Sequence, residues 1–298
     1  MCTARRTETS GTGDSVRPVP SELPAFDLVV ATVGRVDELE RFLGSLEQQT
    51  HTAFRVLVVD QNEDERVGPV VAEHPALDIV RLRSPRGLSR ARNVALARLG
   101  AELVAFPDDD CEYPQDLLER VARRLAQTPN IDGLCGRAID RQGQSSPSWA
   151  QDPVLLTRSN LWNRAISFTI FLRSSLVAAV GGFDEQLGLG SGAPWASGEE
   201  TDYLVRALET SARIEYDPAL VVRHEDKTRS VAARRAAAEP EGASIGYILR
   251  KNRYPFSTVG RMFIRPVGAA LLALVRGDRT GAQFQLATLR GRLRGYFG

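Results

Sequence analysis

The sequence predicts an α/β fold: a doubly wound, mostly parallel sheet flanked by helices, with a basic helical extension at the C-terminus. Two observations support it. From Phe26 onward, short apolar runs typical of buried strands alternate with segments whose apolar residues have helical spacing. Hydrophobic residues make up 43% of the 298 residues and charged residues 25%, which is the balance of an ordinary globular protein. Strands that alternate with helices of this length are typical of βαβ units in a parallel sheet.

The first half of the sequence contains four predicted strand–helix pairs. In the first helix, Leu39, Phe42, Leu43 and Leu46 have helical spacing, and Pro114 stands at the start of the last helix. The predicted strands are residues 26–32, 54–60, 77–82 and 101–110, and the helices are residues 36–49, 66–74, 87–100 and 114–127.

The second half is less regular. Residues 131–163 have an irregular pattern with Gly, Ser and Pro concentrated at 141–149, and we expect a loop that joins a nucleotide-binding half (25–138) to an acceptor half (139–226). The elements expected after it are a strand at 166–173, a short helix, a glycine-rich segment at 181–198, a helix at 199–209 and short strands at 212–216 and 219–226.

Residues 1–24 are polar and contain no apolar core, so they predict a disordered leader and not a signal peptide. Cys2, Cys111 and Cys135 form no paired framework. Cysteine usage of this kind favours a reduced, cytoplasmic setting.

The extension at 227–298 contains 14 Lys and Arg against 3 Asp and Glu, in a protein whose net charge is only +1. A basic tail on an acidic body indicates an anionic partner, either a membrane surface or a phosphate-bearing acceptor, although a solvated basic helical face remains equally open. We expect no nucleic-acid partner. The apolar stretch 267–275, between Arg265 and Arg276, is too short to cross a bilayer. It predicts an interfacial helix or a core-facing helix, of which the second is favoured.

Three consecutive carboxylates, Asp108, Asp109 and Asp110, follow the fourth predicted strand. Ligands of doubly wound sheets bind at the carboxyl ends of strands, and carboxylate oxygens suit Mg²⁺ or Mn²⁺. Adjacent carboxylates also repel one another unless a cation lies among them. The run therefore predicts a metal site, and the alternative is a cap or turn before the next helix.

Basic and polar residues cluster at the start of the third helix. Arg86, Arg90 and Arg92 are suited to neutralise a diphosphate, with Asn93 beside them, and Gly87 permits close approach of the backbone. A solvated helix face is the alternative for at least one of these arginines.

Three carboxylates, Glu199, Glu200 and Asp202, open the helix at 199–209. One of them is a candidate general base for an acceptor hydroxyl, while the simpler explanation is their favourable interaction with a helix N-terminus. The preceding glycine-rich segment around Trp195 predicts a mobile lid with an aromatic platform for a sugar, and plain packing of the indole remains open. His224, at the end of a strand, is a candidate to complete the metal site, although an isolated histidine is more often structural.

Taken in order, these motifs resemble an inverting family 2 glycosyltransferase of the GT-A fold, over about residues 26–226. The matching segments are FDLVVATVGRVDELERFLGSLEQQT, FRVLVVDQNED, RGLSRARNVAL, AFPDDDCEYP, GGFDEQLGLG, SGEETDYLVRAL and VVRHED.

The resemblance implies roles for individual residues. Thr32 and Asp60 would bind the nucleoside, and the aspartate run would hold the ribose and a divalent metal. Spacing to Pro114 assigns Asp109 to the metal and Asp108 to the ribose side, with Asp110 and His224 as further metal ligands. Glu200 takes the position where the family has its catalytic Asp. Val33-Gly34-Arg35 stands where many members have a Tyr-Asn-Arg-like run, and Arg35 is counted among the donor-binding residues.

The function implied is metal-dependent transfer of a sugar from a nucleoside-diphosphate sugar to a glycan, lipid-linked or small-molecule hydroxyl, with Mn²⁺ or Mg²⁺ as cofactor. Two alternatives remain. A sugar nucleotidyltransferase normally has a glycine-rich loop after its first strand, where this chain has only Gly34. A non-catalytic sugar-nucleotide-binding protein has no need to retain Asp109, Glu200 and His224 together.

Overall fold

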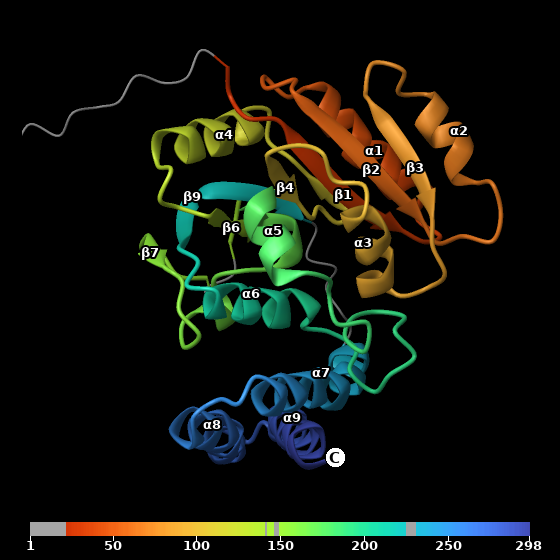
Figure 1. The fold of residues 1–298 in the computed structure, drawn as a ribbon. Helices are drawn as coiled ribbons and strands as arrows, with labels where there is room; N and C mark the ends of the chain where they lie inside the picture. The colour runs from red at the N-terminus through yellow and green to blue at the C-terminus, as the bar shows by residue number, and fades with distance from the viewer. Residues whose placement is uncertain (1–21, 141, 146–148, 225–230) are drawn as a thin grey trace, which may run out of the picture.

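The computed structural model describes residues 22–140, 142–145, 149–224 and 231–298. Most of the predicted leader and the boundary predicted at 226/227 lie outside these residues. The described part is α/β, with the central sheet and flanking helices that the sequence predicts (Figure 1). The strands of the sheet follow the order β3-β2-β1-β4-β8-β6-β9-β5, and β7 pairs with β9.

The first half forms the parallel part of the sheet. Its strands are β1 (Phe26–Thr32), β2 (Phe54–Asp60), β3 (Ile79–Arg83) and β4 (Leu103–Ala105), and its helices are α1 (Val36–Glu47), α2 (Val67–Ala72), α3 (Leu88–Leu96) and α4 (Leu117–Gln127). The β1–β2 register aligns Thr32 with Asp60, so the polar residues that end these strands lie at one edge of the sheet.

The second half adds antiparallel pairs. Its elements are β5 (Cys111–Glu112), β6 (Gly133–Ile139), β7 (Val154–Leu155), the 3₁₀ turns Leu161–Asn163 and Ser167–Thr169, β8 (Ile170–Arg173), α5 (Ser174–Val180), α6 (Glu199–Glu209) and β9 (Ile214–His224). β8 runs antiparallel to β4 and to β6, whereas β6 and β9 are parallel.

Two local predictions were wrong. Residues 133–139, expected within a loop, form the strand β6, whose glycines permit close strand approach: a Cβ on Gly136 would lie 2.2 Å from the Leu220 carbonyl oxygen. The two short strands expected at 212–216 and 219–226 form one strand, β9, which ends at His224. The sequence between 216 and 219 indicates a break between two strands. In the structure, β9 continues through it, and the β6–β9 register shifts between Cys135 and Arg137.

Apolar side chains cover both faces of the sheet. On one face, residues of β1 and β2 pack with α1, α2 and α4. On the other face, different residues of the same strands pack with α3, α5 and α6, and with the C-terminal end of α7. This alternation gives three layers and leaves the strand ends open for a site.

The C-terminal extension is helical in its described part, with α7 (Val231–Lys251), α8 (Phe256–Val275) and α9 (Arg279–Phe297). Figure 1 shows α7 between the sheet domain and the pair α8–α9. Four glycines allow α7 and α9 to touch: Cβ atoms on Gly246 and Gly295 would lie 2.2 Å and 1.9 Å from carbonyl oxygens of the other helix, and Gly242 and Gly291 are similarly close.

The expectation for residues 267–275 needs correction. They belong to a helix of 20 residues that is long and apolar enough, by length and composition, to cross a membrane. In the most apolar 18-residue stretch of this helix only 17% is buried, so the favoured prediction of a core-facing helix was wrong. Two features explain the error: apolar residues continue toward the N-terminus beyond Arg265, and the partner helix α9 covers only one side of α8.

Candidate active site

The centre of the site forms where β4 and β9 end. Asp108 lies beside β1 through a parallel bridge with Ala31, and the chain then turns, with the Cys111 backbone N–H donating to the Asp108 carbonyl at 3.3 Å. Antiparallel pairing of Cys111 with His224 carries the imidazole to this turn, where its Nε2 lies 3.2 Å from Asp110 Oδ1. Pairing of β5 with β9 therefore joins residues that are 114 positions apart.

Asp108, Asp110 and His224 form a group that could hold a metal ion, with one potential ligand atom from each within 4.8 Å of the others. Two carboxylates and an imidazole suit a divalent cation such as Mn²⁺, and three protein ligands leave positions for phosphate oxygens. The donor set thus fits the metal that the sequence predicts, although Asp108, expected on the ribose side, joins the group.

Asp109 is placed differently from its prediction as the principal metal ligand. Its Oδ1 accepts from Arg35 Nη1 at 2.9 Å, and the same nitrogen donates to Asp110 Oδ2 at 2.8 Å. Burial raises the pKa of the Asp109 carboxyl to about 6, although the Arg35 guanidinium acts in the opposite direction. The neighbouring carboxylates thus have different partners: Asp108 contacts Arg92, Asp109 contacts Arg35, and Asp110 contacts Arg35 and His224.

Arg92 connects the metal-binding group to α6. Its side chain is almost fully buried, and it donates to Glu199 Oε1 at 2.9 Å and to Asp108 Oδ1 at 3.2 Å. Ser167 Oγ donates to the same Asp108 oxygen at 3.1 Å. Burial raises the pKa of the Asp108 carboxyl, although Arg92 opposes the rise. The expected diphosphate ligand Arg92 is thus held by two carboxylates in this structure.

Glu200 opens α6 next to this arginine. It lines a small pocket together with Arg92, Phe106, Ser167, Ile170, Phe183 and Tyr203. Burial and the neighbouring Glu199 carboxylate raise the pKa of Glu200 to about 8. Once deprotonated, a carboxylate with a raised pKa is a stronger base than an ordinary one, and the deprotonated fraction of Glu200 grows as pH approaches 8.

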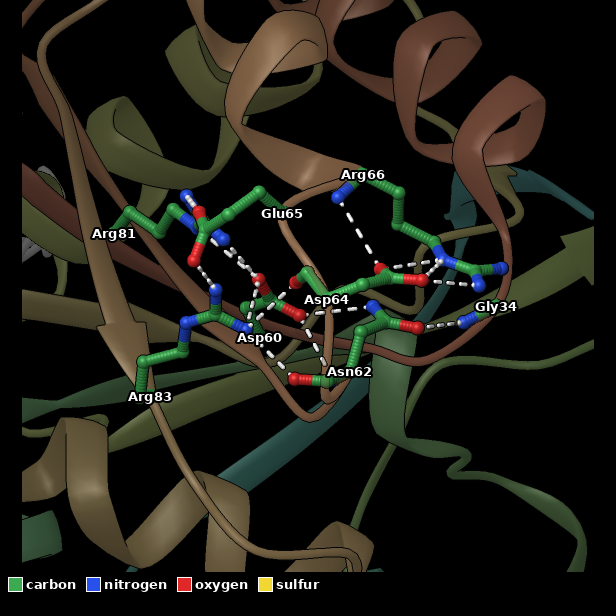
Figure 2. A network of polar contacts seen from close by, with 8 residues as sticks. All are labelled: Gly34, Asp60, Asn62, Asp64, Glu65, Arg66, Arg81 and Arg83. Atoms are coloured by element: carbon green, nitrogen blue, oxygen red, sulfur yellow. Dashed lines mark hydrogen bonds and ion pairs between the residues drawn. The ribbon is translucent and has the colours of Figure 1, made fainter.

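A second polar centre surrounds Asp60, at the end of β2 (Figure 2). The carboxylate is fully buried and accepts from Arg81 at 2.6 Å and 3.0 Å, while Asn62 donates to its other oxygen through both backbone and side chain. Asn62 Oδ1 in turn accepts from the Gly34 backbone N–H at 2.8 Å. Although burial opposes it, these hydrogen bonds lower the pKa of Asp60. Asp60 therefore ties together the loops that follow β1 and β2.

These two loops line a groove of about 420 Å³. Its residues are Val33, Gly34, Asn62, Glu63, Asp64, Arg66 and Arg86. Arg86 is exposed at its rim, as a diphosphate ligand requires. Thr32 is buried at the end of β1, directly before the groove residues.

Three further residues predicted in the site have partners within the protein. Asn93 exchanges hydrogen bonds with the backbone of Phe183, at 2.7 Å and 3.0 Å. The Trp195 indole stacks on Tyr247 of α7, with ring centroids 5.0 Å apart, and is not presented as an open platform. Asp202 is fully buried and accepts from Arg206, Lys251 and Asn252.

Sequence reasoning missed several residues of the site. Ser167 binds Asp108, and the Phe168 ring stacks on His224 with centroids 4.6 Å apart. Both stand in a predicted apolar strand, where neither carries a distinguishing signal. The sequence does contain a signal for Arg81. A charged residue inside a short strand needs a partner of opposite charge, which here is Asp60.

The family model described as "Glycosyl transferase family 2" matches residues 27–179, about half of the chain. The chain belongs to this family. Among curated proteins, this chain is 28% identical to the "Pre-mycofactocin glycosyltransferase" of Mycobacterium tuberculosis. The match extends over 289 residues, which is 89% of this chain and 56% of that protein. It therefore spans about half the length of this relative. A 33% identical match over 108 residues, 36% of each protein, is an "Uncharacterized glycosyltransferase" of Haemophilus influenzae.

Solved structures show the same fold. A mannosyltransferase from Pyrobaculum calidifontis, in complex with GDP-Man and Mn²⁺, has a TM-score of 0.61 and 18% identity, covering 95% of this chain and 90% of that chain. S. aureus TarS in complex with UDP-GlcNAc has a TM-score of 0.59 and 18% identity, covering 91% of each chain. The fold prediction is thereby confirmed as GT-A.

Proposed function

We propose that this family 2 protein is a metal-dependent inverting glycosyltransferase that moves a sugar from a nucleoside-diphosphate sugar to an acceptor hydroxyl. The observation that carries the proposal is the convergence of three features. The group formed by Asp108, Asp110 and His224 is linked through Arg92 to the start of α6, where Glu200 lies in a buried pocket. Family membership supports the same activity.

In the proposed reaction, Glu200 accepts the proton of the acceptor hydroxyl. The hydroxyl oxygen bonds to the anomeric carbon from the face opposite the leaving group, and the bond from that carbon to the diphosphate oxygen breaks. The nucleoside diphosphate leaves with the electron pair, and the anomeric configuration inverts. The deprotonated form of Glu200 is the base in this step, and its raised pKa makes that form strong enough to take the proton at the moment of attack.

The metal would be held by Asp108, Asp110 and His224, with Asp109 positioned through Arg35. When bound, Mn²⁺ or Mg²⁺ stabilises the negative charge that develops on the leaving diphosphate. Arg92 keeps Asp108 and Glu199 in place. We assign the phosphates to Arg86, which lines the groove, and to Arg35, which lies beside Asp109 and Asp110.

We place the nucleoside in the groove at the ends of β1 and β2, with Thr32 directly before its lining residues in the chain and Asp60 holding its two loops. Structural neighbours bind donors of the proposed class, GDP-Man in one case and UDP-GlcNAc in the other. The shape of the groove, open to solvent and lined by polar groups, supports a nucleotide ligand.

For the acceptor we propose a glycan or lipid-linked hydroxyl, and for the location the cytoplasm, at the inner face of the membrane. The exposed apolar helix α8 and the basic tail support this placement. The tail would contact the anionic surface while the sheet domain handles the soluble donor.

The experiment is an incubation with Mn²⁺ or Mg²⁺ and a panel of nucleotide sugars, with and without glycan and lipid-linked acceptors. Release of nucleoside diphosphate that depends on metal and increases with acceptor supports the proposal. Release of pyrophosphate would instead identify a nucleotidyltransferase, and nucleotide-sugar binding without any release would identify a binding protein. Glu200→Gln should abolish release, whereas Glu73→Gln, at the exposed position directly after α2, should leave it unchanged.

A further inference from the structure

One face of α8 is apolar and exposed. Ile264, Val267, Leu271, Leu274 and Val275 follow one another at intervals of three, four, three and one residues, which places them along one side of the helix. Their exposed fractions range from 39% at Val267 to 85% at Val275. The opposite side, with Val259, Pro266 and Ala270, is buried. An exposed apolar stripe of this length marks a contact surface.

Arginines border this stripe. Arg261 and Arg265 stand exposed at its N-terminal end, and Arg276 and Arg279 at its C-terminal end. Residues 253–298 contain eight arginines and one acidic residue, Asp278. Long arginine side chains can lie along an apolar surface and still place their charge in water or among phosphates. The surface thus combines an apolar centre with a cationic border.

The charge decides between two occupants of this face. A second copy of the chain would bring another set of arginines against the first, and like charges oppose such contact. An anionic bilayer offers apolar acyl chains for the stripe and phosphates for its border, which is the environment of interfacial amphipathic helices.

The packing of α9 indicates whether α8 lies on the bilayer or crosses it. A turn at Gly277 and Asp278 joins α8 to α9, and α9 is in backbone contact with α7 through its glycines. The C-terminal end of α7 packs in turn on the sheet domain. If α8 crossed the bilayer, its two ends would lie on opposite sides, and α9 would have to leave α7.

We propose that the exposed face of α8 docks parallel to the surface of an anionic membrane, at the level of the headgroups. This specifies the membrane contact suggested under the proposed function. It rests on exposure, charge and helix packing, so it stands or falls independently of sugar transfer.

The test is flotation of the full chain with vesicles of phosphatidylcholine alone and of phosphatidylcholine mixed with phosphatidylglycerol. We expect binding to the anionic vesicles only, and release by high salt. Arg261→Gln combined with Arg265→Gln should weaken binding roughly thirtyfold, since each basic residue near the surface contributes about a factor of five. Leu271→Gln combined with Val275→Gln should weaken binding by a similar factor.

The matched control is Leu189→Gln, which changes a leucine that is 65% exposed on the sheet domain, outside α8. It should bind as the unchanged protein does. Absence of binding, equal binding to neutral vesicles, or an equal loss with Leu189→Gln would each overturn the proposal. Retention on vesicles through both salt and alkaline carbonate washes would show that α8 crosses the bilayer. A dimer in solution that the α8 variants dissociate would assign the face to a second copy.

Discussion

At the scale of single residues, the site is a set of buried and half-buried carboxylates organised by two arginines. Arg92 lies between Asp108 and Glu199, and Arg35 lies between Asp109 and Asp110. Removing either arginine would leave carboxylates that repel one another in a poorly solvated place. The arginines therefore determine which oxygens point inward, and Asp108 and Asp110 are the aspartates that face His224.

The first prediction separates these aspartates. Asp109→Asn, which alters a neighbour held through Arg35, should weaken Mn²⁺ binding by about 10- to 100-fold, whereas Asp110→Asn should weaken it more, because it changes a direct ligand. The measurement is titration with Mn²⁺ alone, in which electron paramagnetic resonance reports the free ion. A larger loss for Asp109→Asn would restore Asp109 as the principal ligand.

The second prediction concerns Glu200 and pH. The folded, metal-free protein holds the Glu200 proton up to about pH 8, while the unfolded chain loses it near the ordinary value of 4.5. Between these values the folded state binds more protons, so its stability should fall as pH rises, by at most about 5 kcal/mol in total.

Urea unfolding across this pH range is the measurement. Glu200→Gln, which cannot titrate, should be more stable than the unchanged protein at pH 8 and should lose most of this pH dependence. An identical pH dependence in both proteins would mean that Glu200 has an ordinary pKa.

At the scale of elements, the contact between α7 and α9 depends on glycine. Gly242 and Gly246 on α7 face the backbone of α9, and Gly291 and Gly295 on α9 face the backbone of α7. Glycines spaced four residues apart lie on one side of a helix and let two backbones approach closely. Glycine lowers helix stability, and here the close packing offsets that cost.

The third prediction follows from this contact. In Gly295→Ala, the added Cβ would lie 1.9 Å from the Ala243 carbonyl oxygen, so the helices must separate, and we expect a loss of about 1–3 kcal/mol in unfolding free energy. The control is Gly268→Ala, on α8, where the added Cβ would meet no atom of the described residues within 4 Å beyond its own helix turn, and where alanine should stabilise the helix by up to about 1 kcal/mol. Equal effects of the two substitutions in urea unfolding would argue against the packing.

At the scale of the whole molecule, α7 connects the C-terminal extension to the site. Lys251 Nζ lies 2.6 Å from Asp184 and 2.9 Å from Asp202, which is two residues after Glu200 on α6. Tyr247 of the same helix also donates to Asp184 and stacks on Trp195. The extension therefore supports the helix that carries the proposed base.

The fourth prediction tests this support. Lys251→Met should lower the unfolding free energy by about 1–3 kcal/mol, because buried Asp202 loses one of its cationic partners while Arg206 remains. Arg250→Met, which removes the exposed neighbouring charge, should change it by less than about 0.5 kcal/mol. A matching decrease for both variants would show that only the net charge of the helix matters.

Local pattern was enough to predict much of the fold and part of the site. The strands at 26–32 and 54–60 match their predicted bounds, because a buried strand between turn residues produces a continuous apolar run. The strand β6 was missed because its glycines resemble a loop until β8 and β9 pack against it. Trp195 was expected in a lid, since nothing in its neighbourhood shows that Tyr247, more than 50 residues later, covers it.

The sequence by itself determined the alternation of strands and helices, the aspartate run after the fourth strand and the carboxylates that open α6, because each is encoded by neighbouring residues. Only the tertiary structure decided which aspartates face His224, that Arg92 joins Asp108 to Glu199, and that one side of α8 remains exposed. These features depend on strand pairing and helix packing between segments far apart in the chain. Side-chain direction and burial arise from those contacts, which local spacing does not specify.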